Sequence, residues 1–258
     1  MNPDRTTKGL LSFTDRGSGT PLLLIHGLMV SGEMFEPVID RFTATHRVIV
    51  PDLRGHGKSR GLGPPYAPAQ LASDLSNVLD HLKIESTAVL GYSQGGAIAQ
   101  QFALDHPAQC SRLVLACTYA FNMATLREKL EGNLVPILIH LVGMEKFARF
   151  VVSHGAKEMG KERGEWLASL MASQNQSLML SAWKQAMEFD SRSRLAEIRC
   201  PTLIIAGSAD NAVPMHHANT LHHGIAGSRL GVVEGATHAL IWTHPEEFAN
   251  LAQEFLRI

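Results

Sequence analysis

Short apolar runs separated by helical stretches constrain the fold of this chain more than any other feature of its sequence. The runs are continuous rather than alternating, which predicts strands covered on both faces, as in a parallel sheet flanked by helices. Strands that alternate with helices indicate an α/β fold with a doubly wound, mostly parallel sheet. Five clear runs lie at residues 22–25, 47–50, 87–90, 112–115 and 202–205, and a weaker one lies at 229–233.

Other segments fit around these strands. Apolar residues recur at helical intervals across residues 69–82 and again across 97–104. Residues 10–16 are expected to add a strand or hairpin at the edge of the sheet.

The interval between residues 117 and 199 interrupts the alternation, because it contains no convincing strand. It looks helical, is rich in charge and methionine, and is far longer than a single crossover helix requires. We therefore predict a helical cap (lid) insertion at residues 122–190, over one end of the sheet. The α/β core domain would then comprise residues 1–121 and 191–258. The alternative is ordinary helix on the flank of the sheet.

Composition and charge favour a cytoplasmic globular protein. With 258 residues, 45% hydrophobic and 18% charged, the chain has the composition of a folded domain. A net charge of −1 predicts no attraction to nucleic acid or to anionic membranes. Residues 1–8 lack the apolar stretch of a signal peptide, and residues 134–144 are too short to span a bilayer. The three cysteines, Cys110, Cys117 and Cys200, are widely spaced and are expected to stay reduced.

The strongest local motif is Gly91-Tyr92-Ser93-Gln94-Gly95, which follows the run 87–90 and opens a helix from Gly96 onward. A sharp strand-to-helix turn would expose the Ser93 hydroxyl at the carboxyl edge of the sheet, where such sheets bind ligands. Small residues on both sides let strand and helix pass closely. The pattern alone leaves an alternative open, in which Ser93 only caps the helix.

A serine nucleophile needs a histidine base oriented by a carboxylate. Asp210 lies in the loop after the run 202–205, and His238 lies in the loop after 229–233. Both therefore fall at the same sheet edge as Ser93. The chain order Ser, Asp, His is that of α/β hydrolases. We predict Ser93, Asp210 and His238 as the catalytic triad.

Two competing interpretations concern Asp52 and a histidine cluster. Asp52 also follows a strand, but it precedes the nucleophile, so we expect it to fix its own turn. The cluster could suggest a metal site, but only some of its members share a helix face, and no carboxylate or cysteine accompanies them at ligand spacing. We therefore expect a solvated helix and no metal. The cluster comprises His216, His217, His222 and His223.

The oxyanion hole is expected from two backbone N–H groups. One is that of Gln94, after the nucleophile, and the other comes from the loop after the run 22–25. We assign the second to Leu28, with Met29 as the alternative. Gly27 permits the turn, and we expect a structural role for His26.

These motifs occur together in one order: His26-Gly27, residues 52–59, the motif at 91–95, and the loops of Asp210 and His238. In this the chain resembles serine hydrolases of the α/β-hydrolase superfamily, most of all the small capped carboxylesterases and the 3-oxoadipate enol-lactonase group. The resemblance implies the triad and oxyanion donors above, a helical cap, no cofactor and often a homodimer. Serine at the motif sets aside the dehalogenases and epoxide hydrolases of this fold, which use aspartate there.

The expected activity is hydrolysis of small, largely apolar carboxylic esters or lactones through an acyl-enzyme. An enol-lactonase would need a cation for the substrate carboxylate, from Arg127, Lys129, Lys146, Arg149 or Lys157. Further alternatives are a carbon–carbon bond hydrolase, a cofactor-free haloperoxidase or perhydrolase, and a non-turnover sensor of a small molecule. Apolar residues of the insertion could line the pocket, although packing is the commoner role for each: Phe121, Met123, Leu126, Leu130, Phe147, Phe150 and Trp183.

Overall fold

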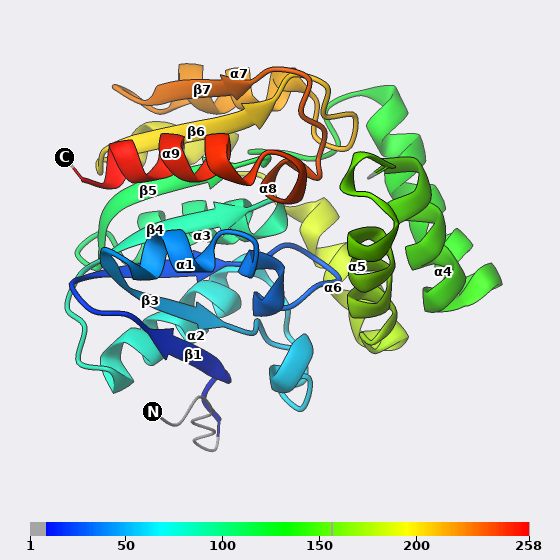
Figure 1. Cartoon of the computed structure of the whole chain (residues 1–258), viewed down its shortest axis with the longest axis horizontal. Coiled ribbons are helices and arrows are strands. Elements are labelled where there is room, and N and C mark those ends of the chain that lie inside the picture. The colour runs from blue at the N-terminus through cyan, green and yellow to red at the C-terminus, as the bar shows by residue number, and fades with distance from the viewer. Residues whose placement is uncertain (1–8, 156, 258) are drawn as a thin grey trace.

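A computed structural model of the chain describes residues 9–155 and 157–257. Its sheet has the strand order β1-β3-β2-β4-β5-β6-β7 (Figure 1). Strands β2 to β7 run parallel, and β1 pairs antiparallel with β3 at the edge. The predicted mostly parallel sheet and the predicted edge strand are thereby confirmed. The strands are β1 (Phe13–Arg16), β2 (Thr20–Ile25), β3 (His46–Pro51), β4 (Thr87–Tyr92), β5 (Cys110–Ala116), β6 (Thr202–Gly207) and β7 (Arg229–Val233).

Helices cover both faces of this sheet, as a doubly wound fold requires (Figure 1). Helices α1, α8 and α9 pack on one face, and α2, α3 and α7 pack on the other. The core helices are α1 (Ile39–Thr43), α2 (Pro68–His81), α3 (Gln94–Asp105), α7 (Met215–Gly224), α8 (Leu240–Thr243) and α9 (Pro245–Leu256).

The continuous apolar runs follow from this double cover. In β2, Leu22 and Leu24 belong to the hydrophobic cluster beneath α1 and α9, whereas Leu23 and Ile25 belong to the cluster beneath α2 and α3. All four side chains are buried. Because alternate side chains enter different cores, every position of a central strand must be apolar.

Three further helices lie beyond the carboxyl ends of the strands (Figure 1): α4 (Leu126–Gly155), α5 (Lys161–Ala172) and α6 (Gln176–Glu188). Helix α4 is broken at Gly143, whose φ of 79° is outside the helical range. An isolated β-bridge joins Phe121 to Asp190, where the chain leaves the core and returns to it. The bridge lies next to the predicted boundaries. The division into a core domain and a cap at 122–190 stays a prediction.

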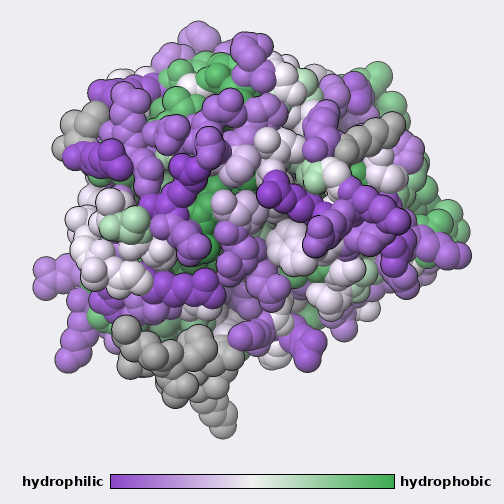
Figure 2. All heavy atoms as spheres, viewed as in Figure 1, coloured by the Kyte–Doolittle hydropathy of each residue, from purple (hydrophilic) through white to green (hydrophobic). Residues whose placement is uncertain are grey.

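Large apolar side chains are exposed along α4, and Figure 2 shows this apolar surface at the right-hand edge of the molecule. Leu126 and Leu141 are each 75% exposed. No helix in the described part of the chain is long and apolar enough to cross a membrane. The homodimer that the family resemblance implies stays a prediction, as does the cytoplasmic location.

Candidate active site

Ser93 occupies the tight turn between β4 and α3. Its backbone has φ 55° and ψ −123°, a conformation that costs energy for any residue with a side chain. A methyl group at Gly91 would overlap the carbonyl oxygen of Gly95, and one at Gly95 would overlap that of Ile25. Only glycine therefore lets the strand and helix approach at this turn. Helix α3 begins at Gln94, two residues earlier than expected, because the glycines of its first turn hid its start.

The side chain of Ser93 does not cap the helix it precedes. Its Oγ lies 3.0 Å from Nε2 of His238, whose Nδ1 lies 2.8 Å from Oδ2 of Asp210. The three residues come from the loops after β4, β7 and β6, as the sequence predicted. The alternative in which Ser93 is only a helix cap is therefore wrong.

Asp210 is held in place by its own loop. Its Oδ1 accepts hydrogen bonds from the backbone N–H groups of Ala212, at 2.9 Å, and Val213, at 2.8 Å. Its side chain is only 1% exposed. The second carboxylate oxygen is thereby left to His238, whose backbone carbonyl accepts a hydrogen bond of 2.8 Å from the Tyr92 hydroxyl.

Asp210 also sets the electrostatics of this chain of hydrogen bonds. Burial alone would lower the pKa of His238. The negative charge of Asp210 and its hydrogen bond to the ring have the larger combined effect, so the pKa is raised above the ordinary histidine value of 6.5. Cys117 lies close to the same carboxylate. Its Sγ, a carboxylate oxygen of Asp210 and a ring nitrogen of His238 all lie within 4.8 Å of one another. Burial and the Asp210 charge raise the pKa of the Cys117 thiol, so that it stays neutral. The sequence interpretation missed this contact.

The loop after β2 lies beside Ser93. A Cβ atom added to Gly27 would be 3.4 Å from Cβ of Ser93, so the glycine leaves room above the hydroxyl. The N–H of Met29 points to Nε2 of His56, at 3.4 Å. The N–H of Leu28 has no acceptor within the described residues. This contrast favours Leu28 over Met29 as the oxyanion donor.

Two buried histidines fix that loop. His26 donates through Nδ1 to its neighbour's carbonyl oxygen, that of Gly27, and accepts at Nε2 from the N–H of Leu53. Burial lowers the pKa of His26 to about 4, and burial followed by the nearby His26 lowers that of His56 to about 3. Both rings are therefore neutral and structural, as expected for His26. The role of His56 was missed, although it lies in the quoted segment 52–59.

Asp52, the rival acid, does not contact His238. Its Oδ2 accepts from the N–H of Lys58 at 2.8 Å, and its Oδ1 accepts from the N–H of Gly32, also at 2.8 Å. It therefore fixes its own turn, as expected, and in addition holds the loop of Gly32.

Comparison with known proteins assigns the chain to a family. Residues 20–245 match the family described as alpha/beta hydrolase fold. The chain belongs to the α/β hydrolase family.

This α/β hydrolase is 30% identical over 245 residues to the pimeloyl-(acyl-carrier protein) methyl ester esterase of Neisseria meningitidis, covering 90% of this chain and 92% of that one. It superposes on an esterase from Exiguobacterium antarcticum with a TM-score of 0.90, at 27% identity and 96% coverage of both chains. The enol-lactonase of Burkholderia xenovorans gives a TM-score of 0.88 at 23% identity and 96% coverage of both chains. At that identity the likeness shows the fold alone.

Two cavities meet at Ser93 in this α/β hydrolase. The smaller, of about 170 Å³, has an almost wholly apolar wall that includes Met34, Leu167 and Trp242. The larger, of about 340 Å³, extends beneath the inserted helices. Ser93, His238 and Leu28 line both. Both cavities therefore border the Ser93 hydroxyl.

Only two of the seven apolar candidates from the insertion, Phe147 and Trp183, line the larger cavity. Phe121 instead packs under the guanidinium of Arg192, at 4.1 Å, and Met123 lies beside Gly132. The remaining three candidates are exposed: Leu126, Leu130 and Phe150.

The candidate cations do not face the cavity. Arg127, Lys129, Lys146 and Arg149 are all exposed. Arg127 pairs with Glu131 at 2.7 Å, and Arg149 pairs with Glu145 at 3.3 Å. The side chain of Lys157 lies outside the described residues. The wall of the larger cavity carries two carboxylates instead, those of Glu128 and Glu131.

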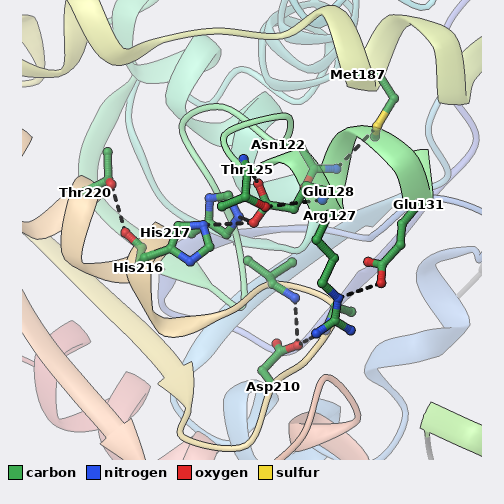
Figure 3. A network of polar contacts seen from close by, with 12 residues as sticks. Asn122, Thr125, Arg127, Glu128, Glu131, Met187, Asp210, His216, His217 and Thr220 are labelled. Carbon is green, nitrogen blue, oxygen red and sulfur yellow. Dashed lines mark hydrogen bonds and ion pairs between the residues drawn. The ribbon is translucent and has the colours of Figure 1, made fainter. Parts of the chain in front are cut away.

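The expectation of a solvated helix is wrong for part of the histidine cluster. His217 is only 2% exposed, and its Nε2 lies 3.2 Å from Oε1 of Glu128 (Figure 3). Nε2 of His216 lies 2.9 Å from the same oxygen. Burial, then the neighbouring His216, lowers the pKa of His217. The carboxylate escaped the sequence analysis because it comes from the insertion, far from α7 in the chain. His223 is exposed as expected.

Proposed function

We propose that this α/β hydrolase cleaves small, largely apolar carboxylic esters through an acyl-enzyme on Ser93. The observation that carries the proposal is the continuous series of hydrogen bonds from Asp210 through His238 to Ser93, at the meeting point of two cavities. The likeness to a methyl ester esterase and to an esterase of the same fold supports the same reaction class. Neutral lactones fit the same chemistry, since they are cyclic esters.

In the first stage, Nε2 of His238 removes the proton of Ser93 as Oγ attacks the ester carbonyl carbon. Negative charge develops on the carbonyl oxygen, and the N–H groups of Leu28 and Gln94 stabilise it. Such donors are worth about 3–4 kcal/mol each. His238 then gives the proton to the leaving alcohol, and the acyl group remains on Ser93.

In the second stage, water replaces the alcohol. His238 takes a proton from the water, whose oxygen attacks the acyl carbon, and the proton returns to Oγ of Ser93 as the acid leaves. Asp210 stays ionised throughout. It holds the ring so that Nε2 faces the serine, and it stabilises the imidazolium that forms in each stage.

The two acidic residues of the larger cavity favour neutral substrates. We expect kcat/KM for dimethyl adipate to exceed that for monomethyl adipate by roughly threefold or more, because the wall of the larger cavity carries the carboxylates of Glu128 and Glu131. The effect is moderated because Glu131 is paired with Arg127. Both esters are compared in enzyme treated with a chelator, so that no metal ion neutralises these carboxylates. The Glu131→Gln variant should narrow the difference, and Glu145→Gln, an exposed control on the same helix, should not. Equal rates for the two esters would contradict this preference, and a higher rate for the monoester would favour an enol-lactonase.

The activity should depend on the protonation of His238. Because Asp210 raises its pKa, kcat/KM should fall as the pH decreases through a value above 6.5, by roughly tenfold per pH unit beyond it. The neutral ring is the base, so the loss occurs on the acid side. Initial rates across pH, with circular dichroism to verify that the protein remains folded, measure the midpoint. A midpoint at or below 6.5 would show that Asp210 does not act on His238 in this way.

A further inference from the structure

Three potential metal ligands converge where the insertion meets the core. Oε1 of Glu128, at the start of α4, lies 2.9 Å from Nε2 of His216 and 3.2 Å from Nε2 of His217, at the start of α7 (Figure 3). All three ligand atoms lie within 4.8 Å of one another. Glu128 lines the larger cavity, but none of the three residues contacts the catalytic hydrogen bonds of Ser93, His238 and Asp210, so their convergence needs a separate explanation.

Hydrogen bonding within the cluster leaves one group unsatisfied. Oε1 of Glu128 pairs with Nε2 of His217. Nε2 of His216 is buried and close to the same oxygen, but it is not aligned for a hydrogen bond and has no other partner among the described residues. A buried polar atom without a partner costs about 1–3 kcal/mol. A cation between the three atoms would satisfy all of them.

The carboxylate is oriented for this role by the end of its own helix. Oε2 of Glu128 accepts a hydrogen bond of 2.8 Å from the N–H of Thr125, and Oγ1 of Thr125 accepts one of 3.2 Å from the N–H of Glu128. This reciprocal pair is a capping box. It uses one oxygen of Glu128 and directs the other towards the histidines, as partners outside a metal site commonly do for metal ligands.

We propose that Glu128, His216 and His217 form a binding site for one divalent transition-metal ion of the zinc class. Two imidazole nitrogens and one carboxylate oxygen are a ligand set that zinc uses, with water in the fourth position. Ligands about 2.0–2.1 Å from a tetrahedral ion are separated by roughly 3.3 Å. The spacings of 2.9 and 3.2 Å need only a small expansion. Magnesium and calcium, which prefer oxygen ligands, do not suit the site.

A metal in this position would join the two parts of the chain. Glu128 belongs to the inserted helices, and the two histidines belong to a core helix that follows β6. The bound ion would therefore stabilise the folded arrangement in which α4 lies over the larger cavity, whose wall includes Glu128. It would not contact the reacting atoms of the ester.

The test is zinc binding by chelator-stripped protein, measured by isothermal titration calorimetry. We expect one Zn²⁺ per chain, no response to Mg²⁺, and a loss of affinity of more than about 100-fold in the Glu128→Gln and His216→Ala variants, since even outer partners of metal sites are worth roughly 10–100-fold. We choose His216 because its side chain is 42% exposed, so its removal should leave the fold intact. Removal of the buried His217 side chain would instead leave a cavity in the core. The control variant is His223→Ala, which replaces an exposed histidine of the same helix. It should bind Zn²⁺ with wild-type affinity.

A further variant distinguishes zinc binding at this site from zinc binding at the other cluster of potential ligands, which consists of Cys117, Asp210 and His238. Binding should persist in His238→Ala. Zinc at 100 times its Kd should also raise the Tm of the wild type by roughly 5–10 °C and leave that of His216→Ala unchanged. No stoichiometric binding, binding unaffected by His216→Ala, or binding lost in His238→Ala would overturn the proposal. Because the readout is binding, its outcome is independent of whether the protein hydrolyses esters.

Discussion

Replacing Ser93 by alanine should lower kcat for hydrolysis of a short p-nitrophenyl ester by about 10⁴-fold or more. The alanine leaves the backbone turn in place but removes Oγ, the proposed nucleophile, which lies 3.0 Å from Nε2 of His238. The two cavities and the oxyanion donors remain. Substrate should therefore still bind, with KM or inhibitor affinity changed much less than kcat.

The matched control is Ser73→Ala, which removes an exposed hydroxyl that donates to the carbonyl oxygen of Ala69 within α2. This variant should keep wild-type rates. A fluorophosphonate probe should label the wild type and the control at one serine and leave Ser93→Ala unlabelled, as intact-protein mass spectrometry would show. Full activity in Ser93→Ala would refute the proposed nucleophile and with it the acyl-enzyme.

Asp210→Asn should lower kcat by about 10⁴-fold while preserving the fold. The amide has nearly the shape of the carboxylate, but its NH₂ group cannot accept the hydrogen bond that Nδ1–H of His238 donates. The ring would then adopt the tautomer in which Nε2 carries the hydrogen, so no lone pair would face the serine. The imidazolium would also lose the negative charge that stabilises it. Pre-steady-state measurements of the alcohol released should show that acylation itself is slow.

Asp52→Asn provides the matched control, because Asp52 is the other aspartate that follows a strand beside the site. Its oxygens bind backbone N–H groups of Gly32 and Lys58. The variant should lose about 1–3 kcal/mol of stability in urea unfolding, with kcat per folded molecule unchanged. If Asp52→Asn lost the activity and Asp210→Asn kept it, the assignment of the acid would have to be reversed.

The sheet could be predicted from the sequence because its strands are buried on both faces. Residues such as Leu23 and Leu24 face different cores, so the run is uniformly apolar and easy to recognise. The pattern also places the ends of the strands, and these ends carry Ser93, Asp210 and His238. Parallel strands bring their carboxyl ends to one edge, so chain order and topology were sufficient to bring the three residues together.

Contacts between distant loops could not be predicted in this way. The N–H of Met29 is held by His56, and Glu128 reaches His217 from another part of the chain. No periodic pattern encodes such pairs. A partial signal was present, since Thr125 and Glu128 have the spacing of a capping box and so mark the start of a helix.

The lining of the larger cavity was the least predictable part. Helix α4 exposes Leu126 and Leu130 and buries Phe147, although all three are large and apolar. The non-helical backbone at Gly143 interrupts the helix, so a single helical period cannot be extended along its length. Burial then depends on how the segments pack and not on residue type.

The bridge between Phe121 and Asp190 brings the two ends of the inserted helices together, so evolution could exchange these helices as a unit. The three groups proposed to react lie at positions 93, 210 and 238, all outside the stretch that this bridge closes. Two recombination points in the gene would therefore suffice to replace the segment between Phe121 and Asp190 with the corresponding segment of a related protein. A substituted segment would need to keep the contacts that Glu128 makes with His217, Gln174 with Gly57 and Arg163 with Trp242. New substrate ranges could then arise by recombination, without altering the machinery for bond cleavage.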